Sequence, residues 1–206
     1  MCIRDRFTAL QALLNSLAVT FDLPILDWIQ AHLQCTFLDV TMPIVTLFGD
    51  GGVFWIAVAV VLLLFAKYRK TGFSMGMALV LGLLVCNILL KPQVARIRPY
   101  NFQLQEYGRE ITLLVKGLND YSFPSGHTIA SFEACTVLML HDKRLGIPAT
   151  VLAILIAFSR LYLYVHYPTD VLVSLVLGIL FGFLGSYIVD QIYKKKVYNG
   201  KYSLKE

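Results

Sequence analysis

Six apolar runs, separated by short polar clusters, constrain the fold of this chain more than any other feature. They cover residues 37–48, 53–66, 73–90, 125–140, 147–163 and 169–189. About 20 apolar residues in an α-helix cross a bilayer core about 30 Å thick, and several of these runs approach that length. The chain is 57% hydrophobic and only 15% charged, with a mean hydropathy of +0.67, which is too apolar for an ordinary soluble domain. We therefore predict an all-α, polytopic transmembrane helix bundle with about six spans.

The N-terminal part of the chain is the least certain to span. The run at residues 37–48 is short and ends in a Gly-Asp-Gly-Gly turn composition at residues 49–52, so it is the weakest span. Before it, residues 23–33 place apolar side chains at helical spacing beside Trp28, which predicts an interfacial helix. Residues 1–6 have neither an apolar core nor a small-residue cleavage site, so they are not a signal peptide. We leave them out of the fold argument as a possible artefact.

Positive charge is clustered between the apolar runs. If six spans alternate, three clusters fall on one side of the membrane, which is the cytoplasmic side under the positive-inside rule. The clusters are Lys67, Arg69 and Lys70; Lys143 and Arg144; and Lys194, Lys195 and Lys196 with Lys201 and Lys205. Three further polar motifs then share the opposite, extracytoplasmic face.

The net charge of +5 does not indicate nucleic-acid binding, because membrane topology explains the placement of the cations better. The four cysteines show no metal-ligand spacing, and Cys86 and Cys135 lie inside apolar runs. Cysteine in such a run behaves as a small hydrophobic residue. We predict no disulfide, no metal site and no cofactor.

The first chemical signal is a set of three cations at span ends: Lys91, Arg98 and Arg160. Each alone is usually a stop-transfer anchor. Here, however, all three lie on the face that should be poor in positive charge. Arginine binds phosphate oxygens bidentately and lysine adds a compact charge, so we favour a phosphate clamp that stabilises a transferring phosphoryl group. Three other cations, which could be loop charges or headgroup contacts, are Arg96, Arg109 and Lys116.

The second signal is Pro124-Ser125-Gly126-His127 at the start of a predicted helix. Pro-Ser alone would be a helix breaker followed by an N-cap. Gly126 lets backbone approach an anion closely, the helix N-terminus offers free N–H groups, and Ser125 can donate a hydroxyl hydrogen bond. We therefore expect His127 to lie beside a bound phosphate, where it can protonate the leaving oxygen.

The third signal is His166 followed four residues later by Asp170. The pair can be purely structural, because a negative charge is favoured at a helix start. A carboxylate on one imidazole nitrogen also fixes the tautomer that exposes the other nitrogen as a nucleophile. With phosphate ligands nearby, we favour His166 as the nucleophile and Asp170 as its orienting partner. Glu133, costly at membrane depth, is left outside this site.

Together, the three signals resemble the motifs of the type 2 phosphatidic acid phosphatase superfamily, which is related to vanadium haloperoxidases. KxxxxxxRP, PSGH and SRxxxxxHxxxD are complete and in order between residues 91 and 170. Among relatives, the size of the chain resembles bacterial undecaprenyl pyrophosphate phosphatases and phosphatidylglycerophosphate phosphatases. The resemblance implies a six-helix membrane phosphatase that needs no metal.

The resemblance also implies a role for each site residue. His166, oriented by Asp170, would attack phosphorus to form a phosphohistidine, and His127 would protonate the leaving group. Water would then release inorganic phosphate. The residues that would hold the phosphate are Lys91, Arg98, Ser125, Gly126 and Arg160.

We therefore predict a metal-independent lipid phosphatase that acts on undecaprenyl pyrophosphate or on a phosphatidic acid or phosphatidylglycerophosphate type of lipid. Two alternatives remain. A vanadate-dependent oxidase could use the same oxyanion cradle, although that chemistry in relatives occurs in soluble proteins. A non-catalytic lipid-binding or transport protein could keep the anion site, although binding alone does not need a nucleophile with an orienting acid.

The predicted domain organisation has three parts. Residues 1–23 form an N-terminal segment, residues 24–190 a membrane phosphatase domain, and residues 191–206 a basic cytoplasmic tail. The predicted partners are a lipid phosphate or diphosphate substrate and membrane lipids, with no nucleic acid and no prediction of oligomeric state. The predicted location is the bacterial plasma membrane, with the active site on the extracytoplasmic face.

Overall fold

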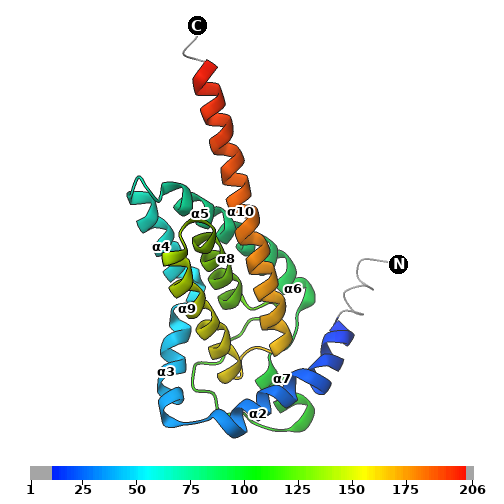
Figure 1. Ribbon diagram of the computed structural model, residues 1–206. Helices are drawn as coiled ribbons and strands as arrows, with labels where there is room; N and C mark the ends of the chain where they lie inside the picture. The colour runs from blue at the N-terminus through cyan, green and yellow to red at the C-terminus, as the bar shows by residue number, and fades with distance from the viewer. Residues whose placement is uncertain (1–10, 203–206) are drawn as a thin grey trace, which may run out of the picture.

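The computed structural model describes residues 11–202, with side chains described as far as Lys195. Residues 1–6, set aside above, and Lys205 lie outside the described residues. Every regular element in the described range is a helix, which confirms the all-α prediction (Figure 1). In chain order the elements are η1 (Ala18–Asp22), α2 (Leu23–Leu33), α3 (Thr36–Leu47), η2 (Asp50–Gly52), α4 (Val53–Leu64), α5 (Arg69–Gly82), η3 (Leu83–Leu90), α6 (Lys91–Val94), α7 (Pro99–Tyr107), α8 (Gly126–His141), α9 (Lys143–Tyr162) and α10 (Pro168–Tyr202).

Five helical segments in the described range are long and apolar enough to cross a membrane. They are Gln11–Leu33, Thr36–Leu64, Arg69–Tyr107, Lys143–Tyr162 and Pro168–Lys195. α8 has only 16 residues and packs against α5, α9 and α10. On the outside of the bundle, large apolar side chains such as Leu64, Val151 and Leu180 are more than half exposed. Exposed apolar surface of this extent is expected of helices that face lipid.

Residues 37–48 and 53–66 form one span, so the prediction of two separate spans there is wrong. α3 and α4 follow one another along the bundle as the kinked segment Thr36–Leu64 (Figure 1). Between them, η2 holds Gly51 and Gly52 at φ values of 56° and 68°. These left-handed conformations are readily adopted by glycine. Here they kink the helix without reversing the chain, although the composition is also that of a reverse turn.

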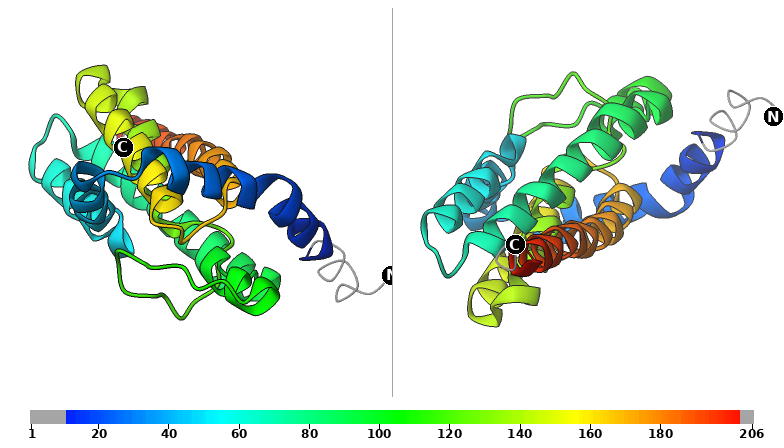
Figure 2. Two further views of the ribbon diagram at one scale, coloured as in Figure 1. Left: turned by 90° about the horizontal axis from the view of Figure 1, so that it is seen from below. Right: turned by 90° about the horizontal axis from the view of Figure 1, so that it is seen from above.

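The predicted interfacial helix at residues 23–33 is longer than expected. It begins by Gln11, passes through the π-helical turn η1 and ends at Leu33. In the view from below, this segment lies across the ends of α9 and α10 (Figure 2). Asp22 joins it to α10, because its Oδ1 accepts a hydrogen bond of 2.9 Å from the backbone N–H of Thr169. The N-terminal helix therefore braces the end of the bundle that carries the motifs.

The basic turns lie at the other end of the bundle. Lys70 after the α4–α5 turn pairs with Asp190 of α10 at 2.7 Å, and Tyr68 donates a 3.3 Å hydrogen bond to Asp142 at the α8–α9 turn. This end is at the top of Figure 1, whereas α2 and α7 lie at the bottom. The error in the early spans does not alter this separation, because the helices from α5 onward alternate as predicted.

The segment from Arg98 to Phe123, which connects the third and fourth apolar runs, begins with a helix. α7 has Pro99 in its first turn and ends at Tyr107, which is followed by Gly108 in a left-handed conformation with φ of 63°. Proline near the start and glycine just past the end are ordinary helix boundaries. Residues 108–125 then return irregularly to α8, and this return places their polar side chains over the end of the bundle.

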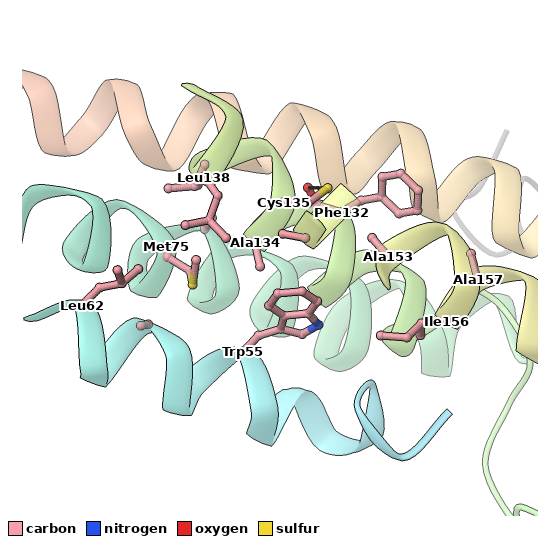
Figure 3. Close-up of a cluster of buried hydrophobic side chains, with 14 of the residues drawn as sticks. Trp55, Leu62, Met75, Phe132, Ala134, Cys135, Leu138, Ala153, Ile156 and Ala157 are labelled. Atoms are coloured by element: carbon pink, nitrogen blue, oxygen red, sulfur yellow. Dashed lines mark hydrogen bonds between the residues drawn. The ribbon is translucent and has the colours of Figure 1, made fainter. Parts of the chain in front are cut away.

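α8 forms the centre of the apolar core. Figure 3 shows its side chains between those of α4, α5 and α9. The buried cluster includes Trp55, Met75, Phe132, Val137 and Ile156. α10 approaches α8 closely at two glycines: a Cβ atom at Gly178 would lie 2.8 Å from Phe132 Cβ, and one at Gly182 would lie 2.7 Å from Thr136 Cβ. This small-xxx-small spacing lets the two helices pack closely.

Candidate active site

The three motif regions meet around one cavity of about 580 Å³ at the end of the bundle opposite the basic turns. Its walls come from the α3–α4 kink, α5 and η3, the loop before α8, the start of α8 and the end of α9. Six of the eight residues predicted for the site line it: Lys91, Arg98, Gly126, His127, Arg160 and His166. The other two, Ser125 and Asp170, are fully buried behind the cavity wall.

Two of the cations share a carboxylate that the sequence argument did not include. Asp120 contacts Lys91 Nζ through one oxygen and Arg98 Nη2 through the other, at 2.5 Å. Burial would raise the pKa of Asp120, but hydrogen bonds and charge from Lys91 and Arg98 outweigh burial and lower the pKa to about 2. A pair of anionic oxygens therefore already lies where these two cations would hold phosphate oxygens.

The two arginines of the cavity are buried and fixed from behind. Arg98 Nη1 donates to the carbonyl of Val165 at 2.7 Å. Arg160, which is 3% exposed, donates from Nη1 to Thr46 Oγ1 at 2.6 Å, and its Nε has no partner among the described residues. Arg98 is anchored through a second donor as well, since its Nε donates to the carbonyl of Asp120 at 2.9 Å, whereas Arg160 keeps Nε for an anion in the cavity.

The start of α8 is built as the PSGH motif predicts, except that the Ser125 hydroxyl group, expected to donate a hydrogen bond, is an acceptor. The Ser125 hydroxyl oxygen accepts hydrogen bonds from the backbone N–H of Thr128 at 3.4 Å and from Thr128 Oγ1 at 2.9 Å. Ser125 is therefore the N-cap of α8. Gly126 lies on the cavity wall, where a Cβ atom would be 3.3 Å from Asn87 Oδ1. The absence of a side chain leaves this helix N-terminus accessible from the cavity.

His127 lies at the α3–α4 kink. A Cβ atom on Gly49 would be 2.7 Å from His127 Cδ2, so the glycine makes room for the imidazole. Nε2 of His127 is 3.9 Å from Asp50 Oδ1. Residues 49–52 were predicted only as a turn. An aspartate between two apolar runs is a signal that could have identified Asp50 as a cavity residue.

His166 has its two ring nitrogens in different surroundings. Nε2 is 3.3 Å from Arg98 Nη1, and since a guanidinium can only donate, Nε2 is the unprotonated nitrogen. Nδ1 faces Asp170 Oδ2 at 3.6 Å and Ser122 Oγ at 3.5 Å. Burial and the positive charges of Arg98, Arg160 and Lys91 hold the pKa of His166 well below its ordinary value. The imidazole is therefore neutral, with a free electron pair on the cavity side.

Asp170 is held by a buried network that the sequence argument largely missed. Its Oδ2 accepts hydrogen bonds from Ser122 Oγ at 2.5 Å and from the backbone N–H of Tyr167 at 3.2 Å. Its Oδ1 accepts one from Arg96 Nη1 at 2.5 Å. Arg96, which lies over the Tyr167 ring at 3.7 Å, also pairs with Asp22 at 2.7 Å. Arg96 is thus neither a loop charge nor a headgroup contact.

Residues 71–194 match the PAP2 superfamily. An undecaprenyl-diphosphatase from Sulfolobus acidocaldarius is 36% identical over 63% of this chain and 61% of its own length. A phosphatidylglycerophosphatase B from Bacillus subtilis is 34% identical over 69% of this chain and 64% of its own length. The matched region is thus about six-tenths of the length of these relatives.

A solved structure resembles nearly the whole chain. The crystal structure of a transmembrane PAP2-type phosphatidylglycerolphosphate phosphatase from Bacillus subtilis has a TM-score of 0.67, covering 93% of this chain and 98% of that chain. Its sequence identity is 24%, so the likeness is one of fold. Together with the apolar helices, it identifies an integral membrane protein.

Proposed function

The chain belongs to the PAP2 superfamily, and from this membership and the site geometry we propose that it is a membrane lipid phosphatase that hydrolyses a lipid phosphate or diphosphate. One observation carries the proposal: the neutral imidazole of His166 has its free nitrogen 3.3 Å from Arg98 in a cavity that two more cations, Lys91 and Arg160, also line. Such a cavity can bind a tetrahedral anion and present a nucleophile to its phosphorus.

Binding precedes the chemical step. Phosphate oxygens take the place of the Asp120 carboxylate on Lys91 and Arg98, and another oxygen meets Arg160 and the backbone at Gly126. Arg98 then turns its donor from His166 Nε2 to the phosphate, which frees the nitrogen for attack. Cations placed around the equatorial oxygens stabilise the charge of the transition state.

Attack by His166 Nε2 forms a nitrogen–phosphorus bond while the bond from phosphorus to the leaving oxygen breaks. With the anionic phosphate bound to offset the surrounding cations, His127 holds a proton and gives it to that oxygen, which leaves as a lipid alcohol or, from a diphosphate, as a lipid monophosphate. The imidazole ring of the phosphohistidine is cationic, and the Asp170 carboxylate facing Nδ1 balances the charge of the ring. A water molecule then attacks phosphorus and gives a proton to His127, so that inorganic phosphate leaves and both histidines return to their starting states.

Membrane orientation follows from charge. Lys67, Lys70 and Lys143 lie at the end of the bundle opposite the cavity, and positive loops favour the cytoplasm. We therefore place the active site on the extracytoplasmic face of the plasma membrane of a bacterium. The relatives named as phosphatases favour this activity over a vanadate-dependent oxidase or a non-catalytic lipid-binding or transport protein.

The test uses the purified full chain in detergent with EDTA, offered phosphatidate, phosphatidylglycerophosphate or undecaprenyl diphosphate. We expect inorganic phosphate from at least one lipid, and a loss of at least about 10³-fold in His166→Ala. His141→Ala is the matched control, because His141 ends α8 away from the cavity, and it should keep wild-type turnover. Undiminished release by His166→Ala would refute the proposed nucleophile, and lipid binding without phosphate release would refute the phosphatase.

A further inference from the structure

The cavity continues into the membrane as an apolar slot beside α8. On α8 it is lined at positions i, i+3, i+4 and i+7, which form one face of a helix. Across from that face stand α5, η3 and α4. The lining residues of this slot are Ile56, Leu79, Gly82, Leu83, Ile129, Ala130 and Glu133. The slot is therefore continuous with the phosphate cradle and has one ionisable side chain.

Glu133 is a buried carboxyl group with one oxygen that has no partner among the described residues. It is 1% exposed, and its Oε1 makes no hydrogen bond among the described residues. The carboxyl group lies directly against Gly82, where even a Cβ atom would collide with it. Burying a polar group without a hydrogen bond costs free energy. A ligand group that enters the slot and hydrogen-bonds to Glu133 would remove this cost.

The distance between Glu133 and the phosphate cradle limits what that group can be. From Gly126 to Glu133 the helix rises by about 10 Å, and helical side chains lean toward the N-terminus. A lipid whose phosphate lies at Gly126 therefore brings to Glu133 the atoms a few bonds below the phosphate. In a glycerolipid phosphate these atoms include the ester carbonyls. In an isoprenyl monophosphate they are all hydrocarbon, and in an isoprenyl diphosphate they are the charged oxygens of the second phosphate.

We propose that the slot is a subsite for the backbone of a glycerolipid phosphate, in which Glu133 donates a hydrogen bond to an acyl ester carbonyl. This inference rests on the proposed phosphatase function and narrows its substrate class. A carboxylic acid in its uncharged form has one O–H donor, and an ester carbonyl is an acceptor only, so the two are complementary. The methylene chains below the ester then follow Ile129 and Leu79 into the bilayer.

The test compares two lipids that differ only at the proposed contact: dioleoyl phosphatidate and its dialkyl ether analogue, which lacks the carbonyls. Wild-type protein should hydrolyse the ester with a kcat/KM about three- to tenfold higher, the range of one net hydrogen bond. Glu133→Leu should bring the ester-to-ether ratio to about one. Glu133→Gln keeps an N–H donor and should retain most of the preference.

Glu106→Leu is the matched control, because it makes the same change at an exposed carboxyl group that does not line the cavity, and it should leave the ratio as in the wild type. The subsite is refuted if wild-type protein treats both lipids equally, or if Glu133→Leu keeps the wild-type ratio. Failure of the phosphatase itself would be seen separately, since wild-type protein would then release phosphate from neither lipid nor from farnesyl phosphate.

Discussion

Replacing Arg96 should slow turnover without weakening phosphate binding. Its guanidinium is 1% exposed and joins two carboxylates: Nη1 donates to Asp170 Oδ1 at 2.5 Å and Nη2 to Asp22 Oδ2 at 2.7 Å. This contact leaves Asp170 Oδ2 directed toward His166. Arg96 does not line the cavity, so it is a positioning residue that acts on the nucleophile through Asp170.

The size of the effect follows from burial and geometry. Removing one partner of a buried ion pair costs about 3–5 kcal/mol of stability, and Arg96→Gln leaves both Asp170 and Asp22 without their cation. A misplacement of about 1 Å at a reacting group can cost about 100-fold in rate, so we expect kcat to fall about 100-fold. KM should stay within about threefold, since when chemistry is slow KM reports binding. Arg96→Lys keeps the charge but loses the planar fork of the guanidinium group, so its kcat should lie between those of Arg96→Gln and the wild type.

The assay is steady-state phosphate release, paired with thermal unfolding and with inhibition by inorganic vanadate, which probes the phosphate cradle. Arg109→Gln is the matched control, because Arg109 joins the same N-terminal helix through Asp27 at 3.0 Å but is half exposed. Exposed pairs contribute about 0–1 kcal/mol, so its stability and kcat should match the wild type. Asp22→Asn gives a second test if Arg96→Gln does not fold. A folded Arg96→Gln protein with wild-type kcat, or with vanadate inhibition lost in step with kcat, would refute the positioning role.

Two other predictions concern the cradle and the core. Asp120→Asn should strengthen inhibition by inorganic phosphate by about fivefold, the value of a partly exposed ion pair, because it removes the carboxylate that competes for the two cations. Since the pKa of Asp120 is lowered to about 2, the carboxylate stays charged down to pH 4 and the gain should be the same from pH 5 to pH 8; a gain confined to high pH would contradict this competition. Gly182→Ala should lower the free energy of unfolding by about 1–3 kcal/mol through overpacking against Thr136. Gly76→Ala, where a Cβ atom meets nothing within 4 Å, should be neutral or stabilising in a denaturant titration, and equal effects of the two changes would contradict the packing argument.

The features that could be predicted from the sequence are those that depend on residues close together in the chain. Lys91, Arg98 and Arg160 were placed at span ends by hydropathy, and the structure has all three on one cavity. The start of α8 followed from a cap and a helix breaker, and Ser125 does cap it. These inferences need only the order of the later helices, which a periodic apolar pattern gives reliably.

The errors and omissions have a different physical origin. A Gly-Asp-Gly-Gly run is typical of a chain reversal, and only the backbone angles of Gly51 and Gly52 decide that it is a kink. The partners of Arg96 are 74 residues away on both sides of the sequence. No local pattern connects Arg96 to Asp22 and Asp170, so sequence reasoning treated it as an ordinary loop charge.

Burial divides the site into a rigid part and an adaptable part. His166, Asp170 and Arg160 are almost completely buried and are held by bonds from several helices, so their geometry is fixed before a lipid arrives. Asp120 is half exposed and lies on the irregular stretch before α8, where it can be displaced by an anion. Because the proposed role of the rigid part is to bind the phosphoryl group, which all the candidate lipids share, discrimination between lipids has to come from what surrounds it. The loop that carries Asp120 and the slot that holds Glu133 are therefore where a change of substrate should be sought.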